Sequence, residues 1–445
     1  MQTTHNIQQV ARLILITFML TAFSLIFWAV LRADDILARD DNPRQVDAAL
    51  QIQRGRILDK NGRSLAETVG PQDDLQRHYP YPAIGPAVGY YSFRHGTSGV
   101  EDSFNPILRG DSHNGWEELW RLALHEPQVG QDIQITLDAD IQMLAEDLME
   151  DQNGALILFS QAEQAADVVS LVSHPGYDPN QLRELFDTLL ADEEAPLLNR
   201  ITQGQYQPGM VLQPFILAFA DDQGFVALTE TVDHPNRPVL INDTATYCAS
   251  TAPESATWQD VLTHRCPGPM RDLADTLSLA NLENAFASFN LTSQPVLPLN
   301  TETATYPALA NAAQTTIGQD NLIVTPLQVA VAWLALNNNG RFLPLRLVSH
   351  IQNEAGDWEP VALEPDKEKT AVSPQTAATI LQALPQTDGI IEFSTLVLSG
   401  PEGTTNTWYL GATPGGEAVV IVLENQTDLS RIETIGRELL TAVQN

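Results

Sequence analysis

The segment QIQRGRILDKNGRSLAE, residues 51–67, defines the first element of the fold. Apolar and polar residues alternate up to Leu58, which is the period of a strand with one buried face. Asp59-Lys60-Asn61-Gly62 then supplies residues that favour a tight turn before a second short apolar run. The segment is therefore predicted to form a β-hairpin.

Outward from this hairpin, strand and helix patterns are grouped rather than regularly alternated. Residues 131–138 (QDIQITLD) predict a strand that ends at a helix cap, and Ala139–Met149 is predicted to be an amphipathic helix. Further strands are predicted at 154–159, 167–173, 407–411 and 418–423, and further helices at 325–337 and 432–443. This grouping favours an α+β fold in which helices flank an antiparallel sheet.

Composition excludes several classes of function. The chain has 56 acidic and 23 basic residues, a formal charge of −33, which would repel nucleic-acid phosphates. We interpret the charge as a solvated acidic surface.

Cys248 and Cys266 are the only cysteines, and without clustered histidines they do not make a zinc site, so no metal or cofactor is predicted. A disulfide between them and two free thiols both remain open.

Leu13–Leu31 is a run of 19 residues without a charge, long enough to cross a hydrocarbon core of roughly 30 Å as a helix. It is predicted to be a single membrane anchor; a cleaved signal peptide and a buried core helix are the alternatives. The flanking charges do not settle orientation, because more arginines follow the run than precede it.

Several short motifs, in the same order along the chain, resemble those of class B penicillin-binding proteins, the membrane-anchored D,D-transpeptidase family. The motifs are Arg54–Gly62, Gly89–Ser92, Gly96–Glu101, Thr136–Asp138, Ser173–Pro175, Tyr177–Asn180, Leu198–Arg200, Tyr206–Gly209, Gly318–Gln319, Thr325–Gln328 and Asn339–Gly340. The resemblance implies a penicillin-binding-protein transpeptidase fold with a small N-terminal pedestal and one transmembrane helix. It also implies an extracytoplasmic soluble domain.

This resemblance divides the chain into four predicted regions. They are a short tail (1–12), the transmembrane anchor (13–31), a juxtamembrane and pedestal region (32–130) and a transpeptidase-like domain (131–445).

Acyl transfer in this family uses a serine with a lysine three residues later, followed by a Ser-x-Asn turn and a Lys-Thr-Gly strand. The residues that flank the first element place Met210 at the position of the nucleophilic serine and Gln213 at the position of the lysine base. The residues that flank the second element place Arg265 at the position of its serine and Pro267 at the position of its asparagine. A thioether cannot form an ester, and a neutral amide is not a base near pH 7.

The third element, placed by Ser399-Gly400 before it and Trp408–Gly411 after it, falls on Pro401-Glu402-Gly403-Thr404, and neither Pro401 nor Glu402 is cationic. The three lysines are Lys60, Lys367 and Lys369, and none has a serine three residues before it. A shifted alignment therefore cannot restore the motif, and no catalytic residue is predicted.

The former site is nonetheless a candidate ligand cleft, with residues Met210, Gln213, Arg265, Gly403, Thr404 and Thr405. Thr404 and Thr405 are expected on a strand edge that can accept a peptide strand. Cys266 beside His264 is interpreted as a packing residue, and His174 as a structural surface histidine.

Three hypotheses follow. The first is a pseudoenzyme that acts as a scaffold or regulator through contacts with cell-wall synthesis proteins. The second is a protein that binds a muropeptide or other peptidoglycan peptide without cutting it. The third is an active transpeptidase with relocated chemistry that uses Cys266 or a threonine.

Overall fold

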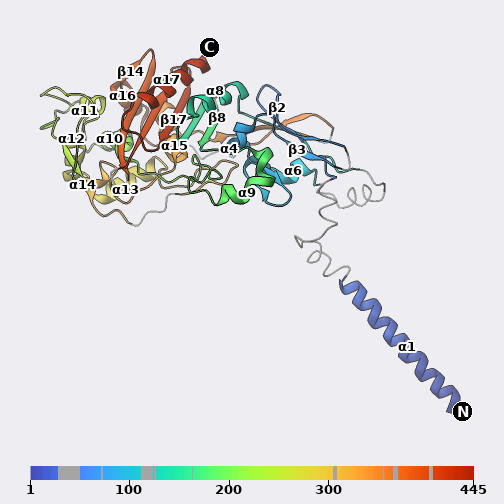
Figure 1. Ribbon diagram of the computed structural model, residues 1–445. Coiled ribbons are helices and arrows are strands. Elements are labelled where there is room, and N and C mark those ends of the chain that lie inside the picture. Colours follow the sequence, from blue (N-terminus) through green and yellow to red (C-terminus); the bar gives the residue numbers. More distant parts are fainter. Residues whose placement is uncertain are drawn as a thin grey trace.

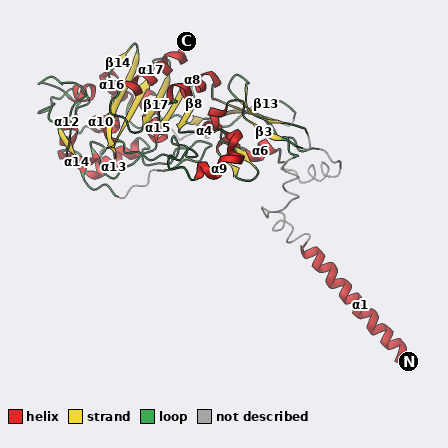
Figure 2. Cartoon of the chain, viewed as in Figure 1, coloured by secondary structure: helices red, strands yellow, loops and turns green. Residues whose placement is uncertain are grey.

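The computed structural model describes residues 2–28, 51–71, 74–111, 124, 127–162, 164–303, 308–353, 355–363, 369–399 and 404–444. A seven-stranded sheet runs through the larger part of the molecule (Figures 1 and 2). Its strands, in spatial order, are β11 (Leu345–Arg346), β8 (Ala166–His174), β7 (Gly154–Gln161), β17 (Glu417–Leu423), β16 (Thr404–Ala412), β15 (Ile390–Ser399) and β14 (Gln386–Thr387). All neighbours are antiparallel except β11 and β8, which pair in parallel at one edge.

Helices cover both faces of this sheet, because its central strands are apolar on both sides. Along β17, Val419 and Ile421 belong to a core cluster that includes residues of α8 (Ala139–Met149) and α17 (Ser430–Gln444). Val420 and Val422 belong to the larger cluster on the other face. That cluster includes residues of α15 (Pro326–Asn337). The predicted α+β fold with flanking helices is confirmed.

The termini of the two predicted long helices follow from capping. Asp138 accepts hydrogen bonds from the backbone N–H groups of Asp140 and Ile141 at the start of α8. Thr325 and Gln328 form a capping box at the start of α15, with Pro326 in its first turn. Seven further helices of the described residues belong to this part of the molecule: α9 (Leu182–Leu190), α10 (Gln213–Asp222), α11 (Trp258–His264), α12 (Pro267–Asp272), α13 (Leu279–Ser288), α14 (Ala312–Thr315) and α16 (Pro374–Ala383).

A second, six-stranded sheet forms the smaller end of the molecule. Its order is β13 (Trp358–Pro360), β12 (Val348–Gln352), β6 (Ile133–Ile135), β1 (Ile57–Leu58), β2 (Ser64–Val69) and β3 (Gln76–His78). The antiparallel β1–β2 pair is the predicted hairpin. Strands β6, β12 and β13 of this sheet come from the region predicted as transpeptidase-like, whereas β1, β2 and β3 come from the region predicted as the pedestal.

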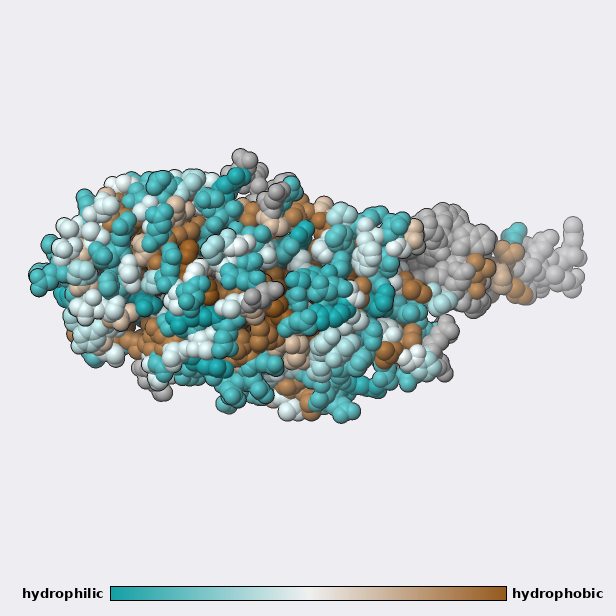
Figure 3. All heavy atoms as spheres, turned by 90° about the horizontal axis from the view of Figure 1, so that it is seen from above, coloured by the Kyte–Doolittle hydropathy of each residue, from teal (hydrophilic) through white to brown (hydrophobic). Residues whose placement is uncertain are grey.

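Short helices and a small hairpin complete the pedestal. They are η2 (Pro82–Ile84), α4 (Gly85–Val88), α5 (Gly99–Ser103), α6 (Asn105–Arg109) and the β4 (Tyr91–Ser92)–β5 (Gly96–Thr97) hairpin. The face of the molecule seen in Figure 3 carries many hydrophilic residues, with apolar residues showing between them.

Helix α1 (Gln2–Ile26) contains most of the predicted anchor, and residues 29–31 of that prediction lie outside the described residues. Among the residues that the structure describes, none of the helices combines the length and the apolar character needed to cross a membrane.

A buried ion cluster ties α5 to the pedestal sheet. The Glu101 carboxylate is fully buried and accepts hydrogen bonds from Arg54 Nη2 at 2.7 Å and Arg77 Nε at 2.6 Å. The Tyr79 hydroxyl also donates to it, at 3.3 Å. Burial alone would raise the pKa of Glu101, but the two guanidinium groups outweigh it and hold the pKa below its ordinary value.

Substituting Glu101→Gln is expected to lower the free energy of unfolding at neutral pH by about 3–5 kcal/mol, because two buried guanidinium groups lose their counter-charge. The depressed pKa of Glu101 makes its contribution present above the unfolded pKa and lost as pH falls through the folded value. The difference between the two proteins should therefore shrink in acid. Urea unfolding between pH 7 and pH 3 measures it; an equal difference at every pH would contradict the assignment.

Candidate functional site

The short 3-10 helix η4 (Gly209–Leu212), which directly precedes α10, lies in close contact with β15. Gly209 has a φ of 53°, and a Cβ built on it would be 2.5 Å from a methyl carbon of Val397. Its N–H donates to Gly318 O at 3.0 Å, and a Cβ on Gly318 would in turn meet the Gly209 oxygen at 2.1 Å. Only glycine fits at both positions, so the place of the next residue, Met210, is fixed by backbone packing.

Met210, at the predicted nucleophile position, lies in η4 (Gly209–Leu212) and is 6% exposed. It lines a cleft of about 420 Å³. Gln213, at the predicted base position, is fully buried and does not line this cleft. Its Nε2 donates to Val261 O at 3.0 Å, whereas its Oε1 has no partner. Gln213 therefore ties α10 to α11.

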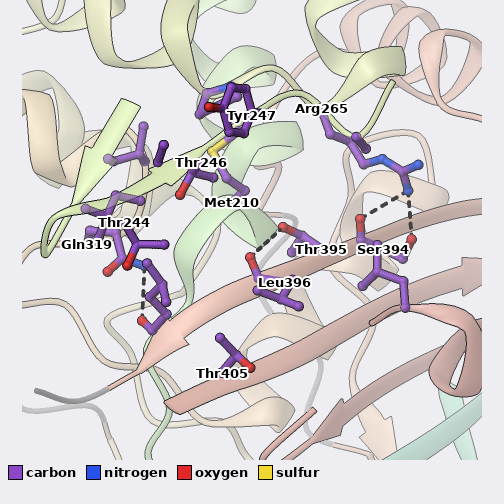
Figure 4. Close-up of a pocket in the computed structure, with 17 residues that line it drawn as sticks. Met210, Thr244, Thr246, Tyr247, Arg265, Gln319, Ser394, Thr395, Leu396 and Thr405 are labelled. Carbon is purple, nitrogen blue, oxygen red and sulfur yellow. Dashed lines mark hydrogen bonds between the residues drawn. The ribbon is translucent and has the colours of Figure 1, made fainter. Parts of the chain in front are cut away.

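Three groups of residues surround Met210 (Figure 4). One wall is the β9 (Val239–Ile241)–β10 (Thr244–Thr246) hairpin with the residues after it, another is the turn at Arg265–Pro267, and the third is β15. The lining residues are Met210, Ile241, Thr244, Ala245, Thr246, Tyr247, Ala249, Arg265, Pro267, Ile317, Gln319, Ser394, Thr395, Leu396, Leu398, Thr405 and Leu429. Arg265 is the one charged residue among them.

Arg265 occupies the predicted position of the second element, in a left-handed conformation with φ 54°. Its Nη1 donates to Ser394 O at 3.1 Å and to Ser394 Oγ at 2.7 Å, and the Ser394 hydroxyl donates to Glu433 at 2.6 Å. Burial lowers the pKa of Arg265, whereas the charges of Glu433 and Glu392 act to raise it. Pro267, the next predicted position, also lines the cleft.

The strand beside Met210 and Arg265 is β15, and its residues Ser394, Thr395 and Leu396 were not singled out from sequence. Of the predicted third element, Pro401, Glu402 and Gly403 lie outside the described residues. Thr404 is exposed and is not part of the lining, whereas Thr405 is. The run IIEFSTLVLS at 390–399, rich in β-branched and apolar residues, is the signal that would have located this strand.

Three side chains of the protein already bond to the cleft edge of β15. Arg265 donates to the carbonyl of Ser394, Gln319 Nε2 to that of Leu398 at 3.3 Å, and Thr395 Oγ1 to that of Leu396 at 3.5 Å (Figure 4). In an antiparallel strand, the N–H and C=O of one residue point to the same side, and alternate residues share that side. The backbone groups of Leu396 therefore face the cleft, and its N–H is the donor that lies between the bonded carbonyls.

Cys248 and Cys266 form a disulfide, which joins the hairpin wall to the Arg265–Pro267 turn. Cys266 is also fully buried. A cysteine bonded in this way has no thiolate to act as a nucleophile, so the structure gives no support to relocated chemistry at Cys266. The neighbouring His264 makes a hydrogen bond through Nδ1 with Ser250 Oγ at 2.8 Å.

His174, interpreted from sequence as a structural surface histidine, is only partly exposed. Its Nε2 lies 2.7 Å from Glu146 Oε2, and Glu146 also accepts from Gln142 Nε2 at 2.8 Å. Burial raises the pKa of Glu146 despite the hydrogen bond to His174. The pair joins α8 to the end of β8 and lies outside the cleft lining. Within the described part of the chain, His, Cys, Asp and Glu form no metal-binding cluster.

Comparison with known families identifies this arrangement. The model of the penicillin-binding protein transpeptidase domain matches residues 159–389, more than half of the chain, and that of the penicillin-binding protein A dimerisation domain matches residues 54–133. The chain therefore belongs to the class B penicillin-binding proteins, a family of peptidoglycan synthesis.

Individual relatives match the chain over all or part of its length. The peptidoglycan D,D-transpeptidase PbpA of Mycolicibacterium smegmatis is 25% identical, covering 98% of this chain and 97% of its own. The transpeptidase MrdA of Escherichia coli is 28% identical over 36% of this chain and 30% of its own. The imipenem acyl-enzyme structure of penicillin-binding protein A from M. tuberculosis matches with a TM-score of 0.79 and 24% identity, covering 89% of this chain and 99% of that one.

Proposed function

We propose that this chain is a catalytically inactive class B penicillin-binding protein that acts as a scaffold or regulator in peptidoglycan assembly. The observation that carries the proposal is Met210 in the first turn before α10, where the family places its nucleophilic serine. A thioether has no proton to lose and forms no acyl ester.

The rest of the cleft supports this proposal, because its lining offers hydroxyl groups but no base. The carboxylate bonded to a lining hydroxyl, Glu433 at Ser394, lies outside the lining, and the Ser394 oxygen is already held by Arg265. Among the described lining residues there are threonine, serine and tyrosine hydroxyls, but no lysine, histidine, aspartate or glutamate. A hydroxyl at its ordinary pKa is a weak nucleophile unless a base or a cationic neighbour activates it. Arg265 does not meet that need, since a guanidinium remains protonated and here donates to Ser394.

The test is acylation of the purified full-length chain by a fluorescent penicillin, with PbpA of M. smegmatis as the positive control. We expect no covalent labelling of this chain and no turnover of a D-alanyl ester substrate, because the cleft lacks both nucleophile and base. Stoichiometric labelling that disappears on prior denaturation would contradict the proposal. Loss of such labelling in Thr395→Ala but not in Thr413→Ala would then locate a relocated nucleophile.

A second candidate function is non-catalytic binding of a peptidoglycan peptide. It is favoured by the cleft of about 420 Å³ and by the Leu396 backbone groups that face it. An extended peptide can pair with such a strand edge. The bonds that Arg265 and Gln319 make to the same edge leave only a short stretch of it for a peptide.

If the cleft binds such a peptide, Leu396→Pro is expected to abolish that binding, because proline removes the N–H that faces the cleft. The β15–β16 ladder should persist, since this N–H lies on the free edge. Calorimetry with a synthetic stem peptide is the measurement, and Leu396→Val, which keeps the N–H, is the matched control. No heat at about millimolar peptide, a range typical of weak binding, would exclude this candidate.

We further propose that residues 13–31 anchor the chain in the membrane by a single pass, with the soluble part on the extracytoplasmic side. The charge-free sequence supports this, as do the exposed apolar side chains of Leu13–Leu25 in α1. Assembly with cell-wall synthesis proteins on that side is part of the same proposal.

Deletion of residues 2–31 is expected to release the chain from membranes, whereas the intact chain should stay in the pellet after alkaline carbonate washing. Immunoblotting of the two fractions measures it. An intact chain found in the wash would overturn the anchor, and a variant lacking only residues 2–12 serves as the control.

A further inference from the structure

The lining of the cleft beside Met210 is almost free of charge. Most of the described lining residues are apolar or carry a hydroxyl group, Gln319 adds a neutral amide, and Arg265 is the only charged side chain among them. Figure 4 shows Met210 between Tyr247 of the hairpin wall and Leu396 of β15. Such a lining complements apolar and neutral polar groups of a ligand.

Arg265 does not supply this cleft with a free positive charge. Its Nη1 donates to the carbonyl and the hydroxyl of Ser394, and its Nε is buried without a partner. The Ser394 hydroxyl donates to Glu433, whose carboxylate counters the charge of the guanidinium. Glu392 and Arg437, which form an ion pair with each other, complete a group of two positive and two negative charges. The group therefore has no net charge to offer an anion.

The residues around the lining are acidic. Of those that adjoin a lining residue in the sequence, Asp243, Asp320 and Asp428 are acidic and none is a lysine or an arginine. Burial alone would raise the pKa of Asp320, but hydrogen bonds from the Asn311 N–H and the Thr315 hydroxyl outweigh it and hold the pKa below its ordinary value. Asp320 is therefore ionised at neutral pH. A ligand carboxylate in the cleft would meet more negative charge than positive.

We propose that the cleft binds a neutral peptide segment, whose carboxyl group is held in an amide bond, in preference to a peptide that ends in a free carboxylate. A neutral amide can enter the cleft without bringing a charge that lacks a counter-charge. Its apolar side chains gain burial against the lining. This inference rests on the second candidate function and selects its ligand.

The preferred ligand corresponds to a product of acyl transfer rather than to its substrate. When an acyl group passes to an amine, the carboxyl group that was transferred becomes an amide and no longer carries a charge. A chain with this preference would recognise peptides that have already been joined. The relatives named as D,D-transpeptidases would then supply its ligand.

The test compares two synthetic peptides of identical sequence. Both are acetylated and end in D-alanyl-D-alanine, one with a free carboxylate and the other with a carboxamide. Calorimetry with the purified full-length chain at pH 7 measures both. We expect saturable binding of the carboxamide and about tenfold weaker binding of the carboxylate, since only the carboxylate brings an uncompensated charge. Salt should reduce the difference, because it screens the repulsion.

Thr244→Lys is expected to raise the affinity for the carboxylate form about tenfold, because Thr244 is exposed, lines the cleft and would place a cation there. The matched control is Leu240→Lys. Leu240 is 63% exposed on the partner strand β9, whereas the next residue, Ile241, lines the cleft, and successive strand residues point to opposite faces. Leu240→Lys therefore adds the same charge outside the lining and should leave both affinities unchanged.

Three results would overturn the inference. They are binding of the carboxylate form as tight as that of the carboxamide form, absence of heat with either form at about millimolar peptide, and an equal gain in affinity in both lysine variants. The first result leaves the second candidate function standing, whereas the second result removes it as well. Labelling by a fluorescent penicillin tests catalytic inactivity separately.

Discussion

The contact between Gly209 and Val397 determines where the first turn before α10 meets the sheet, and the cleft is built around it. A side chain at Gly209 has no room, and the same is true of Gly318, whose carbonyl accepts from Gly209. This packing involves only backbone atoms, the two glycines and Val397, so it does not depend on which residue occupies position 210. Met210 is therefore held in the cleft by its neighbours, and this packing does not depend on the chemistry of its own side chain.

The polar residues around that contact make structural bonds. Gln213 bonds to a carbonyl of α11, Arg265 to Ser394, and Gln319 to Leu398. A buried guanidinium needs compensation, and Arg265 receives it from two oxygens of Ser394 and from the nearby charges of Glu433 and Glu392. Each of these bonds joins segments distant in the sequence, so the cleft walls are held together by groups that a catalytic site would keep free for substrate.

Sequence reasoning located the regular elements well because their signals are local. The cap at Asp138, the apolar pattern of 325–337 and the turn at Asp59–Gly62 predicted α8, α15 and the β1–β2 hairpin. Met210, whose position was taken from the local Pro-Gly turn before it, lines the cleft. The third element was placed from the flanks at Ser399 and Trp408, and its first three positions lie outside the described residues. Ser394–Leu396 were missed because no motif marks the strand before that element as a cleft wall.

Other features depended on contacts between distant segments. The inward orientation of Gln213 and the two pedestal strands after residue 345 have no signal in their own neighbourhood. The Cys248–Cys266 pair had equal alternatives from sequence, because cysteine spacing does not give the spatial approach that a disulfide requires. Long-range contacts of this kind are set by packing across the whole fold, and one sequence carries only the local part of that information.

Most polar groups along the cleft edge of β15 are already bonded within the protein. The carbonyls of Ser394, Leu396 and Leu398 accept hydrogen bonds from Arg265, Thr395 and Gln319. A ligand that paired with this edge would have to compete with these bonds. Its binding would therefore depend more on burial of the apolar lining residues than on new hydrogen bonds to the strand.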